Sequence, residues 1–155
     1  IAIILIIQLV AIFGAMIMSY FATKVGNIKV LIAVVSIWIG ICTGAYYITT
    51  ATQFYAMAIV VGLVMGGIQS LSRSTYSKLI PENTPDTASF FSFYDVAEKV
   101  AIVIGLFSFG YIEEITGSMR NSALSLSSFF FIGLLLLISL LYQKPQASLN
   151  NIVIE

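Results

Sequence analysis

The chain has 155 residues, of which 59% are hydrophobic and only 9% are charged. A soluble domain has about 45–50% apolar and about 25% charged residues, so this composition cannot build a water-facing surface and indicates an integral membrane protein. Seven basic and seven acidic residues give zero net charge, which excludes the basic footprint of a nucleic-acid-binding protein. With a single cysteine and no histidine, the chain offers neither an intrachain disulfide nor a Cys/His zinc site. We therefore expect no cofactor, no metal ion and no nucleic-acid partner.

The first 23 residues carry no charge and predict a first membrane span at 1–23. Lys24 and Lys29 then flank a short polar joint with Gly26, a residue that can turn the backbone tightly. The span lacks the basic start and the small-residue cleavage site of a signal peptide. Because the chain begins inside a span and without methionine, we expect it to be part of a longer protein.

The next neutral run, from 30 to 72, is about twice the ~20 residues that cross a bilayer core. It must therefore fold back once. Polar residues at 48–53, flanked by aromatic residues as at a membrane interface, indicate the turn. The run predicts two spans, at about 30–47 and about 54–72.

Residues 73–86 carry four charges and two prolines, Pro81 and Pro85, which no unbroken helix accommodates. Capping side chains at 84–87 then predict a new helix, at about 87–112. A last charge-free run predicts a fifth span at 121–142, which Lys144 and Pro145 are expected to end. The sequence thus predicts an all-α, polytopic membrane bundle of five transmembrane helices at 1–143, followed by a cytoplasmic tail at 144–155.

The orientation follows from lysine and arginine, which concentrate on the cytoplasmic side of a membrane. Lys99 is set aside because it lies inside a predicted span. Of the other six, Arg120 falls on one predicted side and five on the opposite side: Lys24, Lys29, Arg73, Lys78 and Lys144. The count places the N-terminus outside and the C-terminus in the cytoplasm, with the lipid bilayer as the main partner.

Three charges lie inside the fourth predicted span, at Asp95, Glu98 and Lys99. Each central charge costs about 2.5–3.5 kcal/mol to insert into a bilayer, so the three charges need a counter-ion, contact with water or a functional role. Asp95 and Lys99 have the spacing of a helical ion pair, and Ser92 precedes Asp95 by one turn. One interpretation places Ser92, Asp95 and Lys99 in a solute cavity or gate; the other makes Asp95 and Lys99 a packing pair.

Glu98 has no evident cation of its own and is the candidate proton carrier, because desolvation and a nearby carboxylate both favour the protonated form. A second polar group lies near the end of the third span, where Gln69 and Arg73 share a helix face. Arg73 suits either a solute cavity or the cytoplasmic basic ring. The glycine pairs Gly40/Gly44 and Gly62/Gly66 have the spacing of close helix contacts.

Two segments resemble the vacuole-effluxer-like branch of the major facilitator superfamily. The matching residues are Gly66-Gly67, Gln69, Ser72-Arg73-Ser74, Ile80-Pro81, Phe90-Phe91, Tyr94 and Lys99, with a later Thr116-Gly117-Ser118-x-Arg120. The resemblance implies that the spans correspond to the last five helices of a twelve-helix transporter, whose N-terminal half is the missing partner. Of the superfamily's cytoplasmic loop motif, Lys24 and Gly26 match, whereas Ser19 and Thr23 replace its glycine and aspartate.

The resemblance further implies a secondary active transporter that moves a small-molecule solute by alternating access, with amino acids as the solute class. The proton as coupling ion is the expectation from Glu98. A plasma membrane is then expected in a bacterium, and a vacuolar or other organelle membrane in a eukaryote. The alternative is a non-transporting accessory or truncated membrane subunit. No nucleophile–base pair is recognisable, so an enzyme is not expected.

Overall fold

The computed structural model describes residues 2–81 and 85–150, and every regular element within them is an α-helix. This confirms the prediction of an all-α bundle; the predicted tail beyond Asn150 lies outside the described residues. The helices are α1 (Ala2–Val25), α2 (Asn27–Tyr47), α3 (Ala51–Ser77), α4 (Thr87–Thr116) and α5 (Met119–Asn150).

The helix boundaries depend on local hydrogen bonds and turn residues. Gly26 alone separates α1 from α2, and its φ of 99° confirms that the glycine makes a tight turn. At the start of α3, Thr50 and Gln53 form a capping box. Asp86 caps α4, as the capping residues at 84–87 predicted.

Helices α3 and α5 exceed their predicted lengths the most. Helix α3 continues through the polar residues after 72, where the hydroxyls of Thr75 and Ser77 donate to the carbonyl oxygens of Leu71 and Ser74. These short-range bonds satisfy the hydroxyl groups inside the helix. Helix α3 therefore does not end where the charged and polar residues begin. Helix α5 continues through Pro145 to Asn150, beyond the expected end at Lys144 and Pro145.

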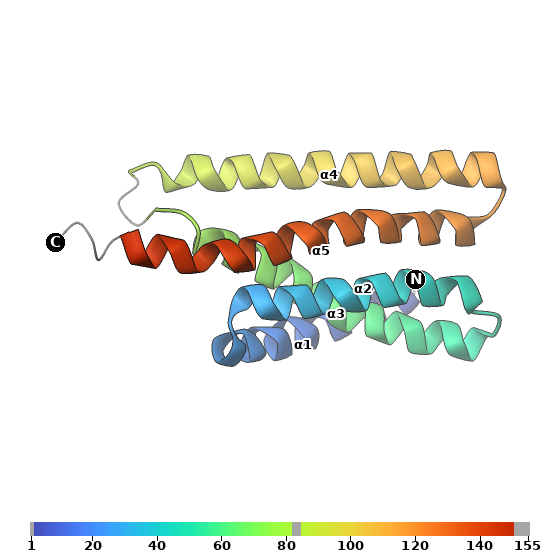
Figure 1. Cartoon of the computed structure of the whole chain (residues 1–155). Coiled ribbons are helices and arrows are strands. Elements are labelled where there is room, and N and C mark those ends of the chain that lie inside the picture. Colours follow the sequence, from blue (N-terminus) through green and yellow to red (C-terminus); the bar gives the residue numbers. More distant parts are fainter. Residues whose placement is uncertain (1, 82–84, 151–155) are drawn as a thin grey trace.

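The five helices run side by side (Figure 1). Helices α1, α2 and α3 contact one another, α5 packs on α2, and α4 packs on α5. No Cα atom of α4 lies within 8 Å of α3 in the described residues. The backbone of α4 is therefore held to the bundle through α5 alone.

The tightest contact is the crossing of α1 and α3. A Cβ atom on Gly66 would overlap the backbone carbonyl of Ala11, and one on Gly14 would overlap that of Leu63. Gly62 is almost as close, since its Cβ would lie 2.9 Å from the Ile7 carbonyl oxygen. The expected close contact at Gly62 and Gly66 is confirmed.

The other glycine pair behaves differently, because a Cβ on Gly40 would meet nothing within 4 Å. The described residues therefore give Gly40 no packing contact, although Gly44 faces Met57. Beside the glycine crossing, a core of buried apolar side chains joins α1, α2 and α3, with Val34 and Leu71 almost fully enclosed. Small residues and apolar packing together hold these three helices.

Four helical segments are long and apolar enough to cross a membrane: Ile7–Val25, Asn27–Tyr47, Ala51–Ser77 and Met119–Tyr142. Helix α4 is not among them, because Asp95, Glu98 and Lys99 lie in its interior and Glu113 and Glu114 near its end. It nevertheless runs along α5 for most of its length (Figure 1). A fifth span at α4 remains a prediction from the sequence.

Replacing Gly66 with alanine should destabilise the protein by about 1–3 kcal/mol, because the added methyl group overfills the α1–α3 crossing. Thermal unfolding of the purified protein in detergent measures the loss. Gly40→Ala is the matched control, since its Cβ has open space. Equal unfolding temperatures for the two variants would contradict the close crossing.

The start of α4 should respond to acid. The Ser89 hydroxyl (2.5 Å) and the Ser89 backbone N–H (3.2 Å) donate to Asp86 and lower the pKa of its carboxyl. Because the folded pKa lies below the unfolded one, the stabilisation is complete above the unfolded pKa and is lost as the pH falls through the folded pKa.

Hydrogen exchange of the first-turn amides of α4, corrected for intrinsic rates, should therefore accelerate in acid. Asp86→Asn keeps a capping side chain that does not titrate, and we expect this variant to lack the acid-induced step. The same step in both proteins would exclude Asp86 as its source.

Candidate functional site

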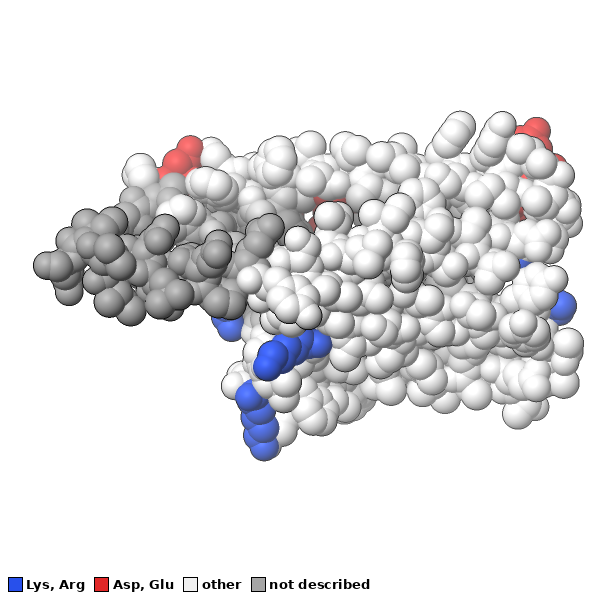
Figure 2. All heavy atoms as spheres, in the orientation of Figure 1, with Lys and Arg blue, Asp and Glu red and all other residues white. Residues whose placement is uncertain are grey.

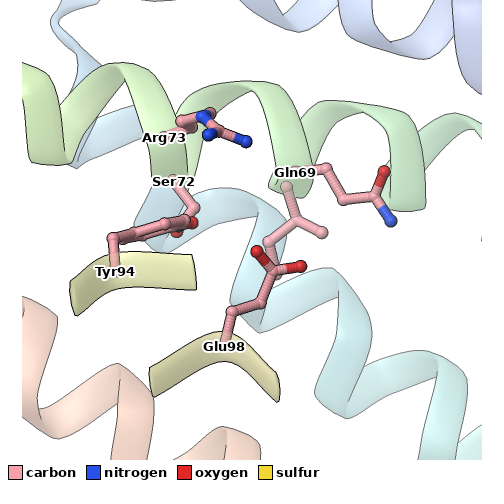
Figure 3. Close-up of a pocket in the computed structure, with 6 residues that line it drawn as sticks. Gln69, Ser72, Arg73, Tyr94 and Glu98 are labelled. Atoms are coloured by element: carbon pink, nitrogen blue, oxygen red, sulfur yellow. Dashed lines mark hydrogen bonds between the residues drawn. The ribbon is translucent and has the colours of Figure 1, made fainter. Parts of the chain in front are cut away.

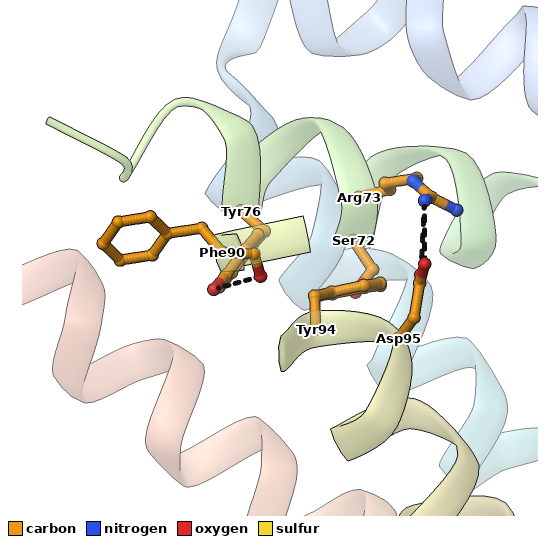
Figure 4. A network of polar contacts seen from close by, with 6 residues as sticks. All are labelled: Ser72, Arg73, Tyr76, Phe90, Tyr94 and Asp95. Atoms are coloured by element: carbon orange, nitrogen blue, oxygen red, sulfur yellow. Dashed lines mark hydrogen bonds and ion pairs between the residues drawn. The ribbon is translucent and has the colours of Figure 1, made fainter. Parts of the chain in front are cut away.

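Three side-chain bridges join α3 to α4 (Figure 4). Arg73 Nη2 lies 3.2 Å from Asp95 Oδ1, the hydroxyls of Ser72 and Tyr94 share a hydrogen bond of 2.9 Å, and Tyr76 donates to the Phe90 carbonyl at 3.0 Å. Since the two backbones do not approach closely, these bridges supply the polar contact between the helices.

A cavity of about 330 Å³ lies between the same two helices (Figure 3). Its lining comes from Ile68, Gln69, Ser72 and Arg73 of α3 and from Tyr94 and Glu98 of α4. The Glu98 carboxylate points from α4 towards α3, and the Gln69 amide projects from α3. The cavity therefore presents a cation, a carboxylate, an amide and hydroxyls to one small volume.

Aromatic rings surround the Arg73 guanidinium. Its Cζ lies 5.7 Å from the centre of the Phe91 ring and 6.0 Å from that of Tyr94, within the range of a cation–π contact. Tyr76 packs on Tyr94 with ring centres 4.9 Å apart. These rings and Asp95 together fix the position of the guanidinium.

The ion pair itself is half exposed, with 55% of the Arg73 side chain and 48% of the Asp95 side chain accessible. Its consequence is geometric, because it ties one turn of α4 to one turn of α3. Arg73 also brings the charge of the predicted cluster to balance, since the cluster then has two basic and two acidic residues.

The expected pair between Asp95 and Lys99 is not formed in the described residues, because Asp95 contacts Arg73 instead. The spacing of four residues allowed a pair between Asp95 and Lys99, but the sequence did not reveal that the Arg73 guanidinium on α3 lies within reach of Asp95. Of the predicted site residues, Gln69, Arg73 and Glu98 line the cavity. Ser92 and Lys99 are exposed and do not line it.

The sequence reasoning gave Tyr94 and Tyr76 no role at the site. Tyr94 lies four residues before Glu98, and the two side chains therefore share one helix face. This spacing could have placed Tyr94 in the cavity. Tyr76 gave no comparable signal, because its role depends on the packing of α4 against α3.

The predicted loop motif lies at one end of the bundle. Lys24 rests over the Tyr20 ring, with its Nζ 4.5 Å from the ring centre, beside the turn at Gly26. Figure 2 shows lysine and arginine atoms gathered at this end, where α1 joins α2, and a smaller basic patch at the opposite end. At that opposite end of the chain's helices, Arg120 donates to the Ile48 carbonyl at 2.8 Å.

Asn27 is the buried polar residue of the α1–α2 joint. Its amide nitrogen donates to the Ser74 hydroxyl at 3.0 Å, and its oxygen accepts from Lys78 Nζ at 2.9 Å. Both ends of the amide are thus satisfied by α3 and the residue that follows it. Among the described residues, no group of three or more Cys, Asp or Glu side chains could hold a metal ion.

Comparison with known proteins places these features in a family. The family described as vacuole effluxer Atg22-like matches residues 1–148. The uncharacterized MFS-type transporter YxiO of Bacillus subtilis is 34% identical over 101 residues, which are 65% of this chain and 23% of that protein. No solved structure matches at a significant level.

Two fungal relatives are similar at a comparable level. Autophagy-related protein 22 of Saccharomyces cerevisiae is 30% identical over 102 residues, which are 66% of this chain and 18% of that protein. Autophagy-related protein 22-1 of Phaeosphaeria nodorum is 36% identical over 75 residues, 48% of this chain and 13% of that protein. The chain thus spans less than a quarter of the length of these relatives.

Replacing Asn27 with alanine should destabilise the protein by about 1–3 kcal/mol, because Ser74 and Lys78 lose a shared buried partner. Thermal unfolding in detergent measures the effect. Lys29→Ala, two residues away on an exposed side chain, is the control and should change stability by less than about 0.5 kcal/mol. An Asn27 variant as stable as this control would exclude a structural role for the amide.

Proposed function

This chain belongs to the vacuole effluxer Atg22-like family, a branch of the major facilitator superfamily, and we propose that it forms part of a secondary active transporter. The transporter moves a small solute across a membrane by alternating access. The observation that carries the proposal is the cavity between α3 and α4, where Arg73, Glu98 and polar side chains line one volume of about 330 Å³.

The lining of the cavity suits a small polar solute. Arg73 and Gln69 offer donors for an anionic or carbonyl group, and Glu98 offers a carboxylate for a cationic group. Pockets of about 300–1,000 Å³ hold small molecules, and a volume of about 330 Å³ falls at the lower end of that range. Helix α4 has no buried residue, which supports further segments of a longer protein completing the site.

Amino acids are the proposed solute class, because an amino acid carries both a carboxylate and an ammonium group. The family resemblance points the same way. Glu98 is the proposed proton carrier, since it faces the cavity while Asp95 is engaged by Arg73. Ser92 and Lys99 lie outside the lining, and any part they take in transport is indirect.

The proposed orientation puts the end of the bundle with Lys24, Lys29 and Lys78 in the cytoplasm, together with the C-terminus. The protein is an integral, multi-pass membrane protein, at the plasma membrane in a bacterium or at a vacuolar or other organelle membrane in a eukaryote. No enzymatic activity is proposed. The greater length of the relatives supports a part of a transporter over a separate accessory subunit.

The test uses the full-length protein in proteoliposomes, with radiolabelled neutral, acidic and basic amino acids and with or without a pH gradient. We expect uptake of at least one class, and we expect Arg73→Gln to lower kcat/KM about tenfold or more, the scale of one charge-assisted hydrogen bond. Lys29→Gln removes a positive charge away from the cavity and is the control. Uptake unchanged by Arg73→Gln would contradict the proposed site.

A separate variant tests the coupling. Glu98→Gln keeps the shape of the side chain but cannot bind or release a proton. We expect it to lose the stimulation of uptake by the pH gradient while solute exchange without a gradient persists. Full stimulation in Glu98→Gln, at equal expression, would exclude Glu98 as the proton carrier.

A further inference from the structure

Asp95 lies within reach of two cations, Arg73 on α3 and Lys99 on its own helix. We propose that Asp95 is a counter-ion shared between them, and that its transfer to Lys99 frees the Arg73 guanidinium for an anionic group of the solute. Lys99 is then a positioning residue, which acts on the site through Asp95. The inference rests on the proposed function, because it assigns a step to the same cavity.

The geometry at Arg73 favours such an exchange. Asp95 contacts a single guanidinium nitrogen, Nη2, at 3.2 Å and 3.5 Å, in place of a two-nitrogen fork. Both side chains are about half exposed in this chain, so its own helices enclose neither charge. The rings of Phe91 and Tyr94 contact the guanidinium independently of Asp95 and would hold it at the cavity.

The geometry at Lys99 supplies the second partner. Lys99 follows Asp95 by four residues, the spacing and order that favour an ion pair on one helix. Its side chain is exposed, and residues four apart on one helix lie close enough for their side chains to pair. The carboxylate would therefore remain neutralised while it leaves Arg73.

The exchange has a structural consequence for the contact between α3 and α4. These helices share no close backbone approach, so loss of the Arg73–Asp95 bridge leaves two side-chain bridges, from Ser72 and from Tyr76. On the α4 side, both bridges attach at Tyr94 or at an earlier residue. Asp95 and the described residues after it in α4 then make no polar contact with α3.

A double-mutant cycle on the purified full-length protein tests the exchange without any solute. Thermal unfolding in detergent gives the coupling between Asp95→Asn and Lys99→Met, first with Arg73 present and then in the Arg73→Gln background. We expect additive effects with Arg73 present, since Asp95 then contacts Arg73. In the Arg73→Gln background we expect a coupling worth roughly 1–3 °C in Tm, because Asp95 has moved to Lys99.

Lys99→Arg is the conservative variant and should restore the coupling in the Arg73→Gln background. The shared counter-ion is refuted by an absent coupling in that background, or by a coupling of the same size when Arg73 is present. Either result would mean that Asp95 has one fixed partner. Neither result depends on transport, so a failure of the proposed function is distinguished from a failure of this inference.

Amino-acid uptake in proteoliposomes gives the second readout. Lys99→Met should raise KM about twofold, the scale of one ion pair on a helix, because an anionic group must then displace Asp95 without a second cation to receive it. The same substitution should have no effect on KM in the Asp95→Asn background, where there is no carboxylate to displace. A loss that persists in that background would mean that Lys99 contacts the solute directly and would overturn its role as a positioning residue.

Discussion

The close crossing of α1 and α3 is the contact on which the arrangement of the other helices depends. Gly14 and Gly66 each face a backbone carbonyl of the opposite helix at a distance that leaves no room for a side chain. Lipid tails are as apolar as leucine side chains, so helices gain little by moving apolar surface out of lipid. The association of helices in a bilayer therefore depends on such close packing. With α2 added to this pair, three helices form one well-packed unit.

Helix α4 is held in a different way. Its backbone approaches α5, and only side chains connect it to α3. Elsewhere in the bundle, small residues let the helices approach closely. Between α3 and α4, long polar side chains span the gap, and the cavity is the space between these side chains. Charges that would be costly in hydrocarbon are tolerable here because Arg73 and Asp95 neutralise each other and polar groups line the volume. The same residues that attach α4 therefore also define the chemistry of the site.

The sequence predicted the breaks between the helices well because these breaks have local causes, although α3 and α5 end later than predicted. The turn at Gly26, the cap at Asp86 and the break before Ala51 all rest on residues within a few positions of one another. The site was predicted only in part. Arg73 and Glu98 stood out as charges in apolar segments, whereas the partner of Asp95 depends on which face of α3 meets α4. A spacing of four residues cannot reveal a cation 22 positions away in the chain.

The amide of Asn27 restricts the motion of α3 relative to the joint between α1 and α2. It donates to Ser74 and accepts from Lys78, so the joint between α1 and α2 is fastened to the end of α3 by bonds of opposite direction. A rotation or slide of α3 would break at least one of these bonds unless the joint moved with it. A displacement of α3 therefore carries the α1–α2 joint with it. Helix α5 packs on these helices through α2, whereas α4 is attached through α5 and through its side-chain bridges to α3.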